Sequence, residues 1–564
     1  MKKNLHASVT YTTIFVLILA FPAFAQWPAD PDSNMMICDR FGDEIIPKIA
    51  ATSDDGCYVC WYDNASGNYD VYMQRLNADG EIQWAPGGLL ISNQPQDTWL
   101  TDYDMTVDSD NHAIVVFNDI RAGGDWDIYA YRISPAGDFV WGDYGLTISD
   151  NVNFEADPVI AVTSFGNFVF AWQDEVSVYL RKVNPLGADM WSPHTINLTS
   201  LYGLGVPRIV PAEDDGVIVS YMQGTGPNWW DPHHLYAQKF DLLGLEQWPS
   251  GGVAINAAGG LALYMEYGLA PDDNGGAYCY WYDDRDMTLN GYVQHIQSDG
   301  TVGWMADGVQ VSTAAGELQM NPSLVTFPAS GEVMTFYLAT DSNQNLNGVH
   351  GQKLDSLGAR QWGSNGIAFV PMSSQTRSHI SAQPQTDGAI IVYKEFPQGN
   401  TVQSYIKAMR VDMDGNQVWT TSPVDVCSNL SEKGRIPTTV HEAEMVIAAW
   451  DDCRLDSNGD IYLQNINPDG TLGPPPDTLG CSYEVGDVNN SGTYDGLDII
   501  YGVAFFKGGS PPPYECECTP GNTWYVAGDV NNSCTYNGLD ITYGVAYFKG
   551  GPLSMPCEDC PPVG

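Results

Sequence analysis

The chain has 564 residues, of which 69 are Asp or Glu and only 23 are Lys or Arg, so its formal net charge is −46. A surface this acidic repels nucleic acid and anionic lipid, and we expect neither as a partner. Aromatic residues make up 12% of the chain, which suffices for a substantial core despite the charge.

The N-terminus has the composition of a secretory signal peptide. Lys2 and Lys3 precede an apolar stretch from Ile14 to Phe24, and Ala23-Phe24-Ala25 matches a cleavage site. The stretch is too short for a transmembrane helix, and no other segment is apolar enough to span a bilayer. The sequence therefore predicts that residues 1–25 are removed and that the protein is secreted or held at the cell surface.

A short pattern recurs through residues 45–474, and most copies end in tryptophan. Successive tryptophans lie 50 to 58 residues apart. They are Trp84, Trp141, Trp191, Trp248, Trp304, Trp362 and Trp419. The eighth copy has Pro474 in place of the tryptophan. Repeats of this length indicate a propeller or a solenoid. Because the tryptophan has a fixed place in each unit, core packing is favoured over ligand binding for these residues.

Each unit has the pattern of four short strands. In the first unit these are Lys48–Thr52, Cys57–Tyr62, Asp70–Leu76 and Leu89–Ser92, with Asp-Gly turns between the apolar runs. Alternating apolar residues and such turns are typical of antiparallel hairpins. The sequence thus predicts an all-β, eight-bladed β-propeller over residues 26–473. Seven blades are the alternative if one unit is irregular, and a β-solenoid is less favoured.

The two ends of this region predict how the ring closes. The eighth unit lacks a fourth strand, because the chain runs from Gly473 into three prolines. Asn34–Asp39 resembles the fourth strands of other units, such as Val424–Asn429. We therefore expect the N-terminal strand to complete the last blade and to leave no unpaired edge.

The connections between the second and third strands vary most, so they mark the candidate face for binding a polysaccharide or a protein. Trp126, Trp229 and Trp230 lie in these connections and either stack on sugars or pack on neighbouring loops. An acid also recurs after the second strand, at Asp63, Asp119, Asp174, Asp283 and Asp452. Sugar hydrolysis needs two carboxylates at a fixed separation, but recurrence in many blades favours a structural role.

Two 24-residue segments near the C-terminus, Gly486–Gly509 and Gly528–Gly551, are identical at 20 positions. Each begins with a 12-residue loop whose oxygen-bearing residues have the spacing of calcium ligands. The predicted ligands are Asp487, Asn489, Ser491, Thr493, Asp495 and Asp498 in the first loop, and Asp529, Asn531, Ser533, Thr535, Asn537 and Asp540 in the second. At the sharp turn, Cys534 replaces Gly492 and makes the geometry of the second loop uncertain. The alternative is two Asx-rich turns without metal.

Two calcium loops, each followed by an apolar helical run and joined by a spacer, resemble a type I dockerin. The resemblance implies a dockerin-like domain over residues 485–564, after a Pro-rich linker at residues 474–484. Members of that family dock secreted proteins, often enzymes that degrade polysaccharides, onto cohesin domains of a scaffold. Gly496-Leu497 and Gly538-Leu539 stand where the family often has Ser-Thr. The resemblance thus implies Ca²⁺ binding and a cohesin-like or surface scaffold partner, without identifying that partner.

The twelve cysteines fit an oxidising compartment. Six lie before residue 460 and six in the C-terminal region, so each set is even and allows internal bridging, with no pairing assigned. A zinc site at Cys516, Cys518, Cys557 and Cys560 is a weaker alternative, because no histidine lies nearby.

These features support two hypotheses. The first is a secreted, non-catalytic protein whose propeller binds a glycan or protein and whose calcium-binding tail docks it to a partner. The second is a propeller glycoside hydrolase or lyase of polysaccharide catabolism, targeted by the same tail. The first is preferred, because the sequence matches neither the sialidase-type Asp box nor the Gly-x-Ser-x-Gly and His-Glu-x-x-His patterns.

Overall fold

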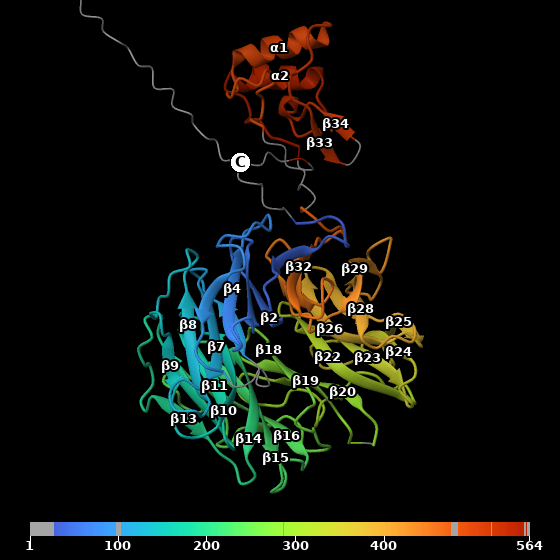
Figure 1. Cartoon of the computed structure of the whole chain (residues 1–564). Helices are drawn as coiled ribbons and strands as arrows, with labels where there is room; N and C mark the ends of the chain where they lie inside the picture. Colours follow the sequence, from blue (N-terminus) through green and yellow to red (C-terminus); the bar gives the residue numbers. More distant parts are fainter. Residues whose placement is uncertain are drawn as a thin grey trace, which may run out of the picture.

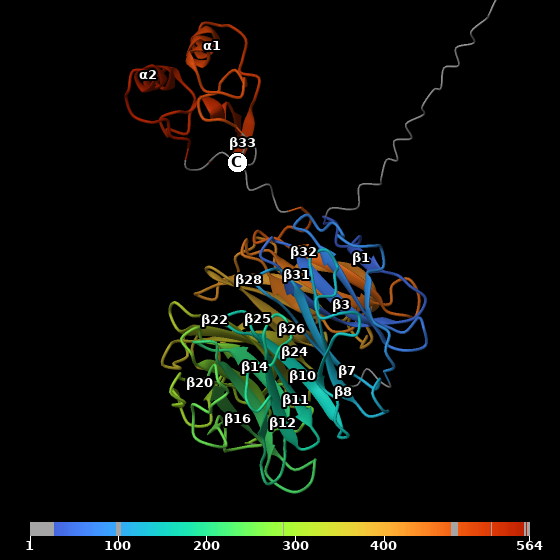
Figure 2. The same ribbon diagram turned by 90° about the vertical axis from the view of Figure 1, so that its left-hand side faces the viewer.

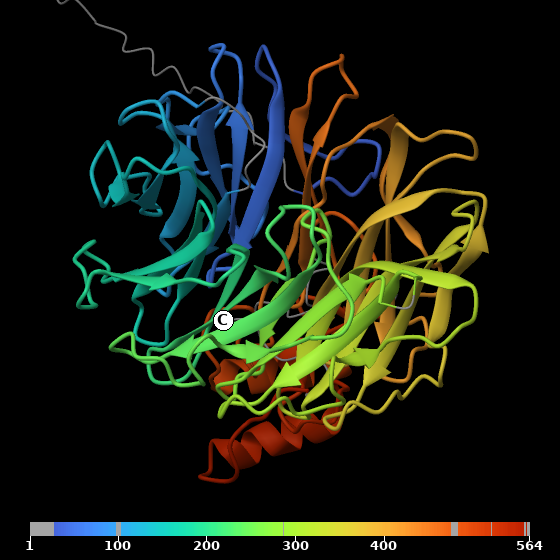
Figure 3. The ribbon, with the colours of Figure 1, turned by 90° about the horizontal axis from the view of Figure 1, so that it is seen from below.

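The computed structural model describes residues 27–96, 103–285, 287–474, 483–519, 522–557 and 560. Eight four-stranded antiparallel sheets follow one another around a ring, so the fold is the predicted eight-bladed β-propeller (Figure 1, Figure 3). The seven-bladed and solenoid alternatives are wrong. The predicted signal peptide and residues 475–482 of the predicted linker lie outside the described residues. Within the described residues, no helix is long and apolar enough to cross a membrane.

In the first seven blades the strands pair in chain order. Blade 1 comprises β2 (Glu44–Ala51), β3 (Cys57–Asp63), β4 (Asp70–Leu76) and β5 (Leu89–Ser92), and blade 2 comprises β6 (Asp104–Val107), β7 (Ala113–Asp119), β8 (Asp127–Ile133) and β9 (Leu146–Ser149). Blade 3 comprises β10 (Glu155–Val162), β11 (Phe168–Asp174), β12 (Ser177–Val183) and β13 (Thr195–Leu198), and blade 4 comprises β14 (Leu204–Pro211), β15 (Val217–Gly224), β16 (His233–Phe240) and β17 (Val253–Ala254).

The second half of the ring has the same order. Blade 5 comprises β18 (Gly268–Pro271), β19 (Ala277–Asp283), β20 (Asn290–Ile296) and β21 (Val309–Gln310), and blade 6 comprises β22 (Glu317–Phe327), β23 (Glu332–Asp341), β24 (Asn347–Leu354) and β25 (Ile367–Ser373). Blade 7 comprises β26 (Arg377–Gln385), β27 (Gly388–Glu395), β28 (Gln403–Asp412) and β29 (Val424–Glu432), and blade 8 comprises β30 (Thr438–Val440), β31 (Val446–Asp452), β32 (Asp460–Ile466) and the N-terminal β1 (Met35–Cys38).

The N-terminal segment closes the ring. β1 pairs with β32 and supplies the fourth strand of blade 8, as the sequence predicts. Just before β1, Trp27 is 1% exposed and donates its indole N–H to the carbonyl of Ala78 in blade 1, 2.9 Å away. Trp419 makes the same bond, at 2.8 Å, to the carbonyl of Pro468 in blade 8. Trp27 therefore takes the part of the tryptophan that Pro474 replaces.

Each repeated tryptophan joins two neighbouring blades. The indole N–H groups of all seven predicted residues donate to carbonyls in the third-to-fourth-strand turn of the next blade, at 2.8 to 3.3 Å. A glycine in such a turn is required for two reasons, its backbone conformation and its close contact with the tryptophan ring. Gly80 has a φ of 82°, and a Cβ added to it would lie 2.8 Å from the Trp27 ring. The packing role predicted for these tryptophans is confirmed.

The C-terminal region contains two helices, α1 (Gly496–Phe506) and α2 (Gly538–Tyr547), which lie side by side (Figure 2). It also contains a hairpin of β33 (Cys516–Thr519) and β34 (Asn522–Trp524), followed by a 3₁₀ turn, η1 (Val526–Gly528). Each helix begins at a capping box, with Asp495 or Asn537 as the N-cap residue. The helical runs predicted after the two loops are thus present.

The cysteines correct two expectations. Those of the propeller are free thiols, so the internal bridging expected there is wrong: Cys38, Cys57, Cys60, Cys279, Cys427 and Cys453. Cys57 and Cys60 share β3 but face different core clusters. In the C-terminal region, Cys534 and Cys557 form a disulfide, and Cys516 and Cys560 are also disulfide-bonded. The zinc alternative for that region is wrong as well, because oxidised sulfurs are not zinc ligands.

Candidate functional sites

The first predicted calcium loop is built around Asp487. Its carboxylate accepts hydrogen bonds from the backbone N–H groups of Ser491 at 2.8 Å and Gly492 at 2.6 Å. Asp498, at position 12, accepts from two further backbone N–H groups of the loop at 3.1 and 2.8 Å. Both aspartates are buried, whereas Thr493 and the other intervening ligands lie at the surface or half-buried. The backbone N–H groups of the loop therefore point to the carboxylates at its first and last positions.

The second loop repeats this geometry. Asp529 accepts from the backbone N–H groups of Ser533 at 3.1 Å and Cys534 at 2.7 Å, and Asp540 accepts from two loop N–H groups at 3.3 and 2.8 Å. Cys534 has a φ of 54° and keeps the left-handed turn that Gly492 makes at 85°. Its side chain is held by the disulfide described above. The cysteine thus leaves the loop conformation intact.

Four buried carboxylates in these loops lack a cationic partner. Asp487 is 6% exposed, and Asp498, Asp529 and Asp540 are at most 1% exposed. No ion pair joins them to Lys or Arg within the described part of the region, whose two lysines are exposed at the helix ends. Burial raises the pKa of Asp498, and it raises that of Asp540 to about 6. Uncompensated negative charge among oxygen donors fits a bound Ca²⁺ ion.

Two glycines let the helices cross closely. A Cβ added to Gly502 of α1 would lie 2.3 Å from the hydroxyl of Tyr536 in the second repeat. The reciprocal contact brings a Cβ on Gly544 of α2 within 2.4 Å of the hydroxyl of Tyr494 in the first. The two repeats are therefore related by approximate two-fold symmetry. The same arrangement leaves apolar side chains on the helices exposed, most of all Leu497 (63%), Ile500 (66%) and Leu539 (69%).

The five recurrent acids of the propeller are structural. Asp119, Asp283 and Asp452 are at most 1% exposed, and each pairs with the arginine two residues later. Each arginine lies over a third-strand tyrosine at 3.8 to 4.0 Å from the ring centre. Asp63 pairs with an arginine of the N-terminal segment, and Asp174 accepts from two asparagine side chains. These acids hold the second-to-third-strand connections, and the structural interpretation is confirmed.

The loop tryptophans differ from one another. Trp126 packs against Phe154 with ring centres 4.8 Å apart, so it has a packing role. Trp229 and Trp230 are 73% and 65% exposed and contact each other edge to face at 5.5 Å. They lie between β15 and β16, on the face that the sequence predicts as variable. This pair remains the candidate for stacking on a sugar.

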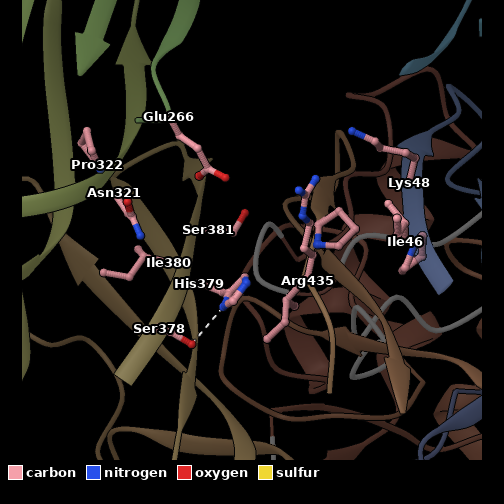
Figure 4. A pocket seen from close by; sticks show the side chains of 13 residues that line it. Ile46, Lys48, Glu266, Asn321, Pro322, Ser378, His379, Ile380, Ser381 and Arg435 are labelled. Carbon is pink, nitrogen blue, oxygen red and sulfur yellow. Dashed lines mark hydrogen bonds between the residues drawn. The ribbon is translucent and has the colours of Figure 1, made fainter. Parts of the chain in front are cut away.

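A cavity of about 280 Å³ lies where the blades meet at the centre of the ring. Ile46, Lys48, Glu266, His379 and Arg435 line it, from blades 1 and 7 and from the connections that enter blades 5 and 8. Figure 4 shows Lys48, Arg435 and Glu266 directed into the same space, with His379 beside it. A second cavity, of about 200 Å³, shares Lys48 and reaches blades 2, 3 and 4. Sequence reasoning missed this central site.

Strained backbone lines both cavities. Ile46, Asp157, Val206, Asn321 and His379 have φ values between 49° and 55°. Each lies at a bulge that shifts the pairing between the first and second strands of its blade. Such φ values are costly for β-branched residues and cluster at functional sites. All but the last of the five precede a proline, a recurrence visible in the sequence that would have marked the channel.

The described lining of the central cavity carries two cations and one acid. Lys48 and Arg435 lie there with Glu266, and the adjoining cavity that shares Lys48 adds Asp104, Asp157 and Arg208. Desolvation within the channel, together with the charges of Lys394 and Arg435, lowers the pKa of His379, although its side chain is exposed to the channel. The imidazole is therefore neutral at pH 7, and its lowered pKa makes it a weak base. Chemically, the site attracts an anion and presents an unprotonated base beside a guanidinium group.

Comparison with known proteins gives no family. No family model matches the chain, and no curated protein matches it. Among solved structures, an ulvan lyase of polysaccharide lyase family PL25 is 10% identical, over 77% of this chain and 96% of that chain, with a TM-score of 0.41. The Dos1 propeller is 12% identical over 77% and 94%, also at 0.41. An α-L-arabinanase of Penicillium chrysogenum is 13% identical over 55% and 92%, at 0.30. Likeness at this level identifies neither ligand nor reaction.

Proposed function

We propose that the C-terminal region is a calcium-loaded docking domain that attaches the propeller to another protein. The observation that carries this proposal is the burial of Asp487, Asp498, Asp529 and Asp540 without a cation. Ca²⁺ bound by these residues and by the Asn, Ser and Thr oxygens between them would neutralise the loops and fix the start of each helix. The proposed partner is a cohesin-like or surface scaffold protein.

The proposed contact surface is apolar and symmetric. Leu497 and Leu539 are exposed at position 11 of the two loops, and Ile500 extends the surface on α1. A partner that covers these side chains gains hydrophobic stabilisation that depends on calcium only through the position of the helices. The proposal therefore separates the metal ligands from the partner contacts.

Calorimetry of the chelator-treated chain tests the metal. We expect two Ca²⁺ ions, and Asp487→Ala should remove one of them, whereas no heat at millimolar calcium refutes the proposal. Immobilised full-length protein then tests the partner with proteins secreted by the same organism. Leu497→Asp combined with Leu539→Asp should keep both ions and lose the captured scaffold protein. Capture that is unchanged in this variant refutes the contact surface.

For the propeller, we propose that the central cavity binds an acidic polysaccharide. Lys48 and Arg435 concentrate positive charge there, although Asp and Glu outnumber Lys and Arg threefold in the chain. Carboxylated or sulfated sugars offer the complementary charge. Trp229 and Trp230, in the connection between β15 and β16, would add a stacking surface for sugar rings. In binding assays, acidic oligosaccharides should bind with higher affinity than neutral oligosaccharides of equal length. Equal affinity for both refutes this assignment.

A second candidate function is elimination at a uronate, and the neutral His379 beside Arg435 favours it. The imidazole would take the proton α to the sugar carboxylate while the guanidinium group stabilises the negative charge that forms. The bond to the leaving glycosidic oxygen then breaks, that oxygen takes a proton from solvent water, the proton on the imidazole returns to solvent, and a C=C bond remains. Hydrolysis fits less well, because Glu266 is the only carboxylate lining this cavity. New ultraviolet absorbance on uronate polymers, lost in His379→Asn, supports elimination, and binding without absorbance restricts the site to recognition.

A further inference from the structure

One junction between blades differs from the others in charge. Cys38 ends β1, Glu44 begins β2 and Asp63 ends β3, so the three meet where blade 8 adjoins blade 1. Their exposed fractions are 2%, 0% and 1%. The thiol sulfur and one oxygen from each carboxylate all lie within 4.8 Å of one another. A free thiol and two acids are thus gathered in a site closed to solvent.

Glu44 has almost no protein partner in this site. Its Oε2 accepts one long hydrogen bond, 3.3 Å from the backbone N–H of Arg40, and its Oε1 is buried with no partner among the described residues. Asp63 is better held, by the Arg40 side chain at 3.1 Å and by the backbone N–H of Ala65 at 2.8 Å. A buried carboxylate with so little compensation calls for a cation.

The equivalent junctions in two other blades contain side-chain hydrogen-bond donors, although one oxygen of the blade 3 acid, Glu155 Oε2, also has no partner among the described residues. In blade 3, Ser149 and Glu155 take the strand positions of Cys38 and Glu44, and Asn151 donates to both Glu155 and Asp174 at 2.7 and 2.8 Å. In blade 7 the same positions carry Ser373, Arg377 and Glu395. Arg377 pairs with Glu395 at 2.9 Å and donates to the Ser373 hydroxyl at 3.0 Å. An amide or a guanidinium group therefore fills the space that Glu44 leaves unfilled.

We propose that Cys38, Glu44 and Asp63 form a zinc site at the junction of blade 8 and blade 1. One thiolate and two carboxylates are zinc ligands, and a bound water would complete a tetrahedral set. The soft thiolate favours Zn²⁺ over the Ca²⁺ expected in the C-terminal loops. The ligands carry three negative charges when the thiol is ionised, and Zn²⁺ together with Arg40 balances them. The site would fix the N-terminal strand that closes the ring.

The full-length protein in millimolar calcium tests this proposal, because calcium keeps the C-terminal loops occupied. After treatment with a zinc-selective chelator, the protein should rebind one Zn²⁺ per chain. Cys38→Ser and Glu44→Gln should each lose that ion, and zinc should raise the thermal midpoint of the wild type but not of these two variants. The matched controls are Cys427→Ser, a buried propeller thiol, and Glu155→Gln, the equivalent acid of blade 3. Both should retain the ion.

Cobalt gives a readout that needs no variant. Co²⁺ in the proposed site should produce a near-ultraviolet thiolate-to-metal charge-transfer band in the wild-type protein, because a sulfur ligand is present. No such band, or zinc binding unchanged in Cys38→Ser, overturns the proposal. Loss of the ion in Cys427→Ser overturns it as well, because the sulfur ligand would then be a different cysteine.

Discussion

Removal of calcium from the C-terminal region should make its stability fall as the pH rises from 4 to 7. Asp540 is 1% exposed, and burial raises its pKa to about 6. In the unfolded chain an aspartate titrates near ~3.9. Between these values the folded state keeps a proton that the unfolded state releases, so stability decreases with rising pH across this window. Below pH 4 the carboxyl group of Asp540 is protonated in both states. Above pH 6 the full free-energy cost of burying the ionised carboxylate is present.

The size of this effect follows from the same values. A difference of about 2 pKa units corresponds to about 3 kcal/mol, or roughly a 100-fold change in the opening equilibrium of the local structure. The Ca²⁺ ion proposed for this loop would bind the ionised carboxylate and remove this free-energy cost. The apo region should therefore be less stable at pH 7 than at pH 4.5, and the loaded region should show no such loss.

Hydrogen exchange of the α2 amides in the full-length chain measures this directly, after correction for the intrinsic pH dependence of exchange. With chelator, protection should fall roughly 25-fold from pH 4.5 to pH 7, because the unfolded carboxyl is already mostly ionised at pH 4.5, and calcium should restore it. Asp540→Asn should abolish both the pH dependence and the response to calcium in the second loop. Asp495→Asn, at an exposed cap of the other loop, should leave α2 unchanged. Equal or greater protection at pH 7 without calcium refutes the reasoning.

Three further changes probe the ring, the helix crossing and the cavity. Trp27→Ala should lower the free energy of unfolding by about 3–5 kcal/mol, seen as a lower urea midpoint. The control Trp229→Ala should change it by less than ~0.5 kcal/mol. An effect of Trp27→Ala as small as that of the control would contradict ring closure by Trp27. Gly544→Ala should reduce α2 protection, although alanine favours helix by about 1 kcal/mol, whereas Gly538→Ala meets no atom within 4 Å and should not. Arg435→Ala should weaken acidic oligosaccharide binding roughly 10- to 100-fold in calorimetry, and unchanged affinity would remove the cavity as the site.

The propeller was predictable because its unit repeats. Asp70–Leu76 and Leu89–Ser92 are strands with the predicted bounds, and the ring closes through the predicted N-terminal strand. Trp27 lies before residue 45, where the recurring pattern begins, so the pattern itself does not include it. It precedes Trp84 by 57 residues, the same interval that separates several later tryptophans. The periodicity thus already contained the eighth tryptophan.

The sites differ in what the sequence reveals. Calcium ligands lie within 12 consecutive residues, so their spacing alone predicts them. The central cavity brings Lys48 and Arg435 together across almost 400 residues, and only the closed ring makes them neighbours. The ion pairs of the recurrent acids are also visible in the local sequence. An arginine two residues after Asp119, Asp283 and Asp452 already indicates an ion pair.

The distribution of positive charge links the two proposed functions. In the propeller, Arg121, Arg285 and Arg454 neutralise buried aspartates, and Lys182 is fully buried against Asp215. The two cations that line the central cavity, Lys48 and Arg435, are therefore not part of a generally basic surface. Their position supports the proposal of an anionic ligand in that cavity. The C-terminal region has two lysines, both exposed, and no arginine. Its buried carboxylates must be neutralised from outside the chain, by protons at low pH or by Ca²⁺ at neutral pH. The pH dependence proposed for Asp540 and the metal dependence of docking thus have one physical cause.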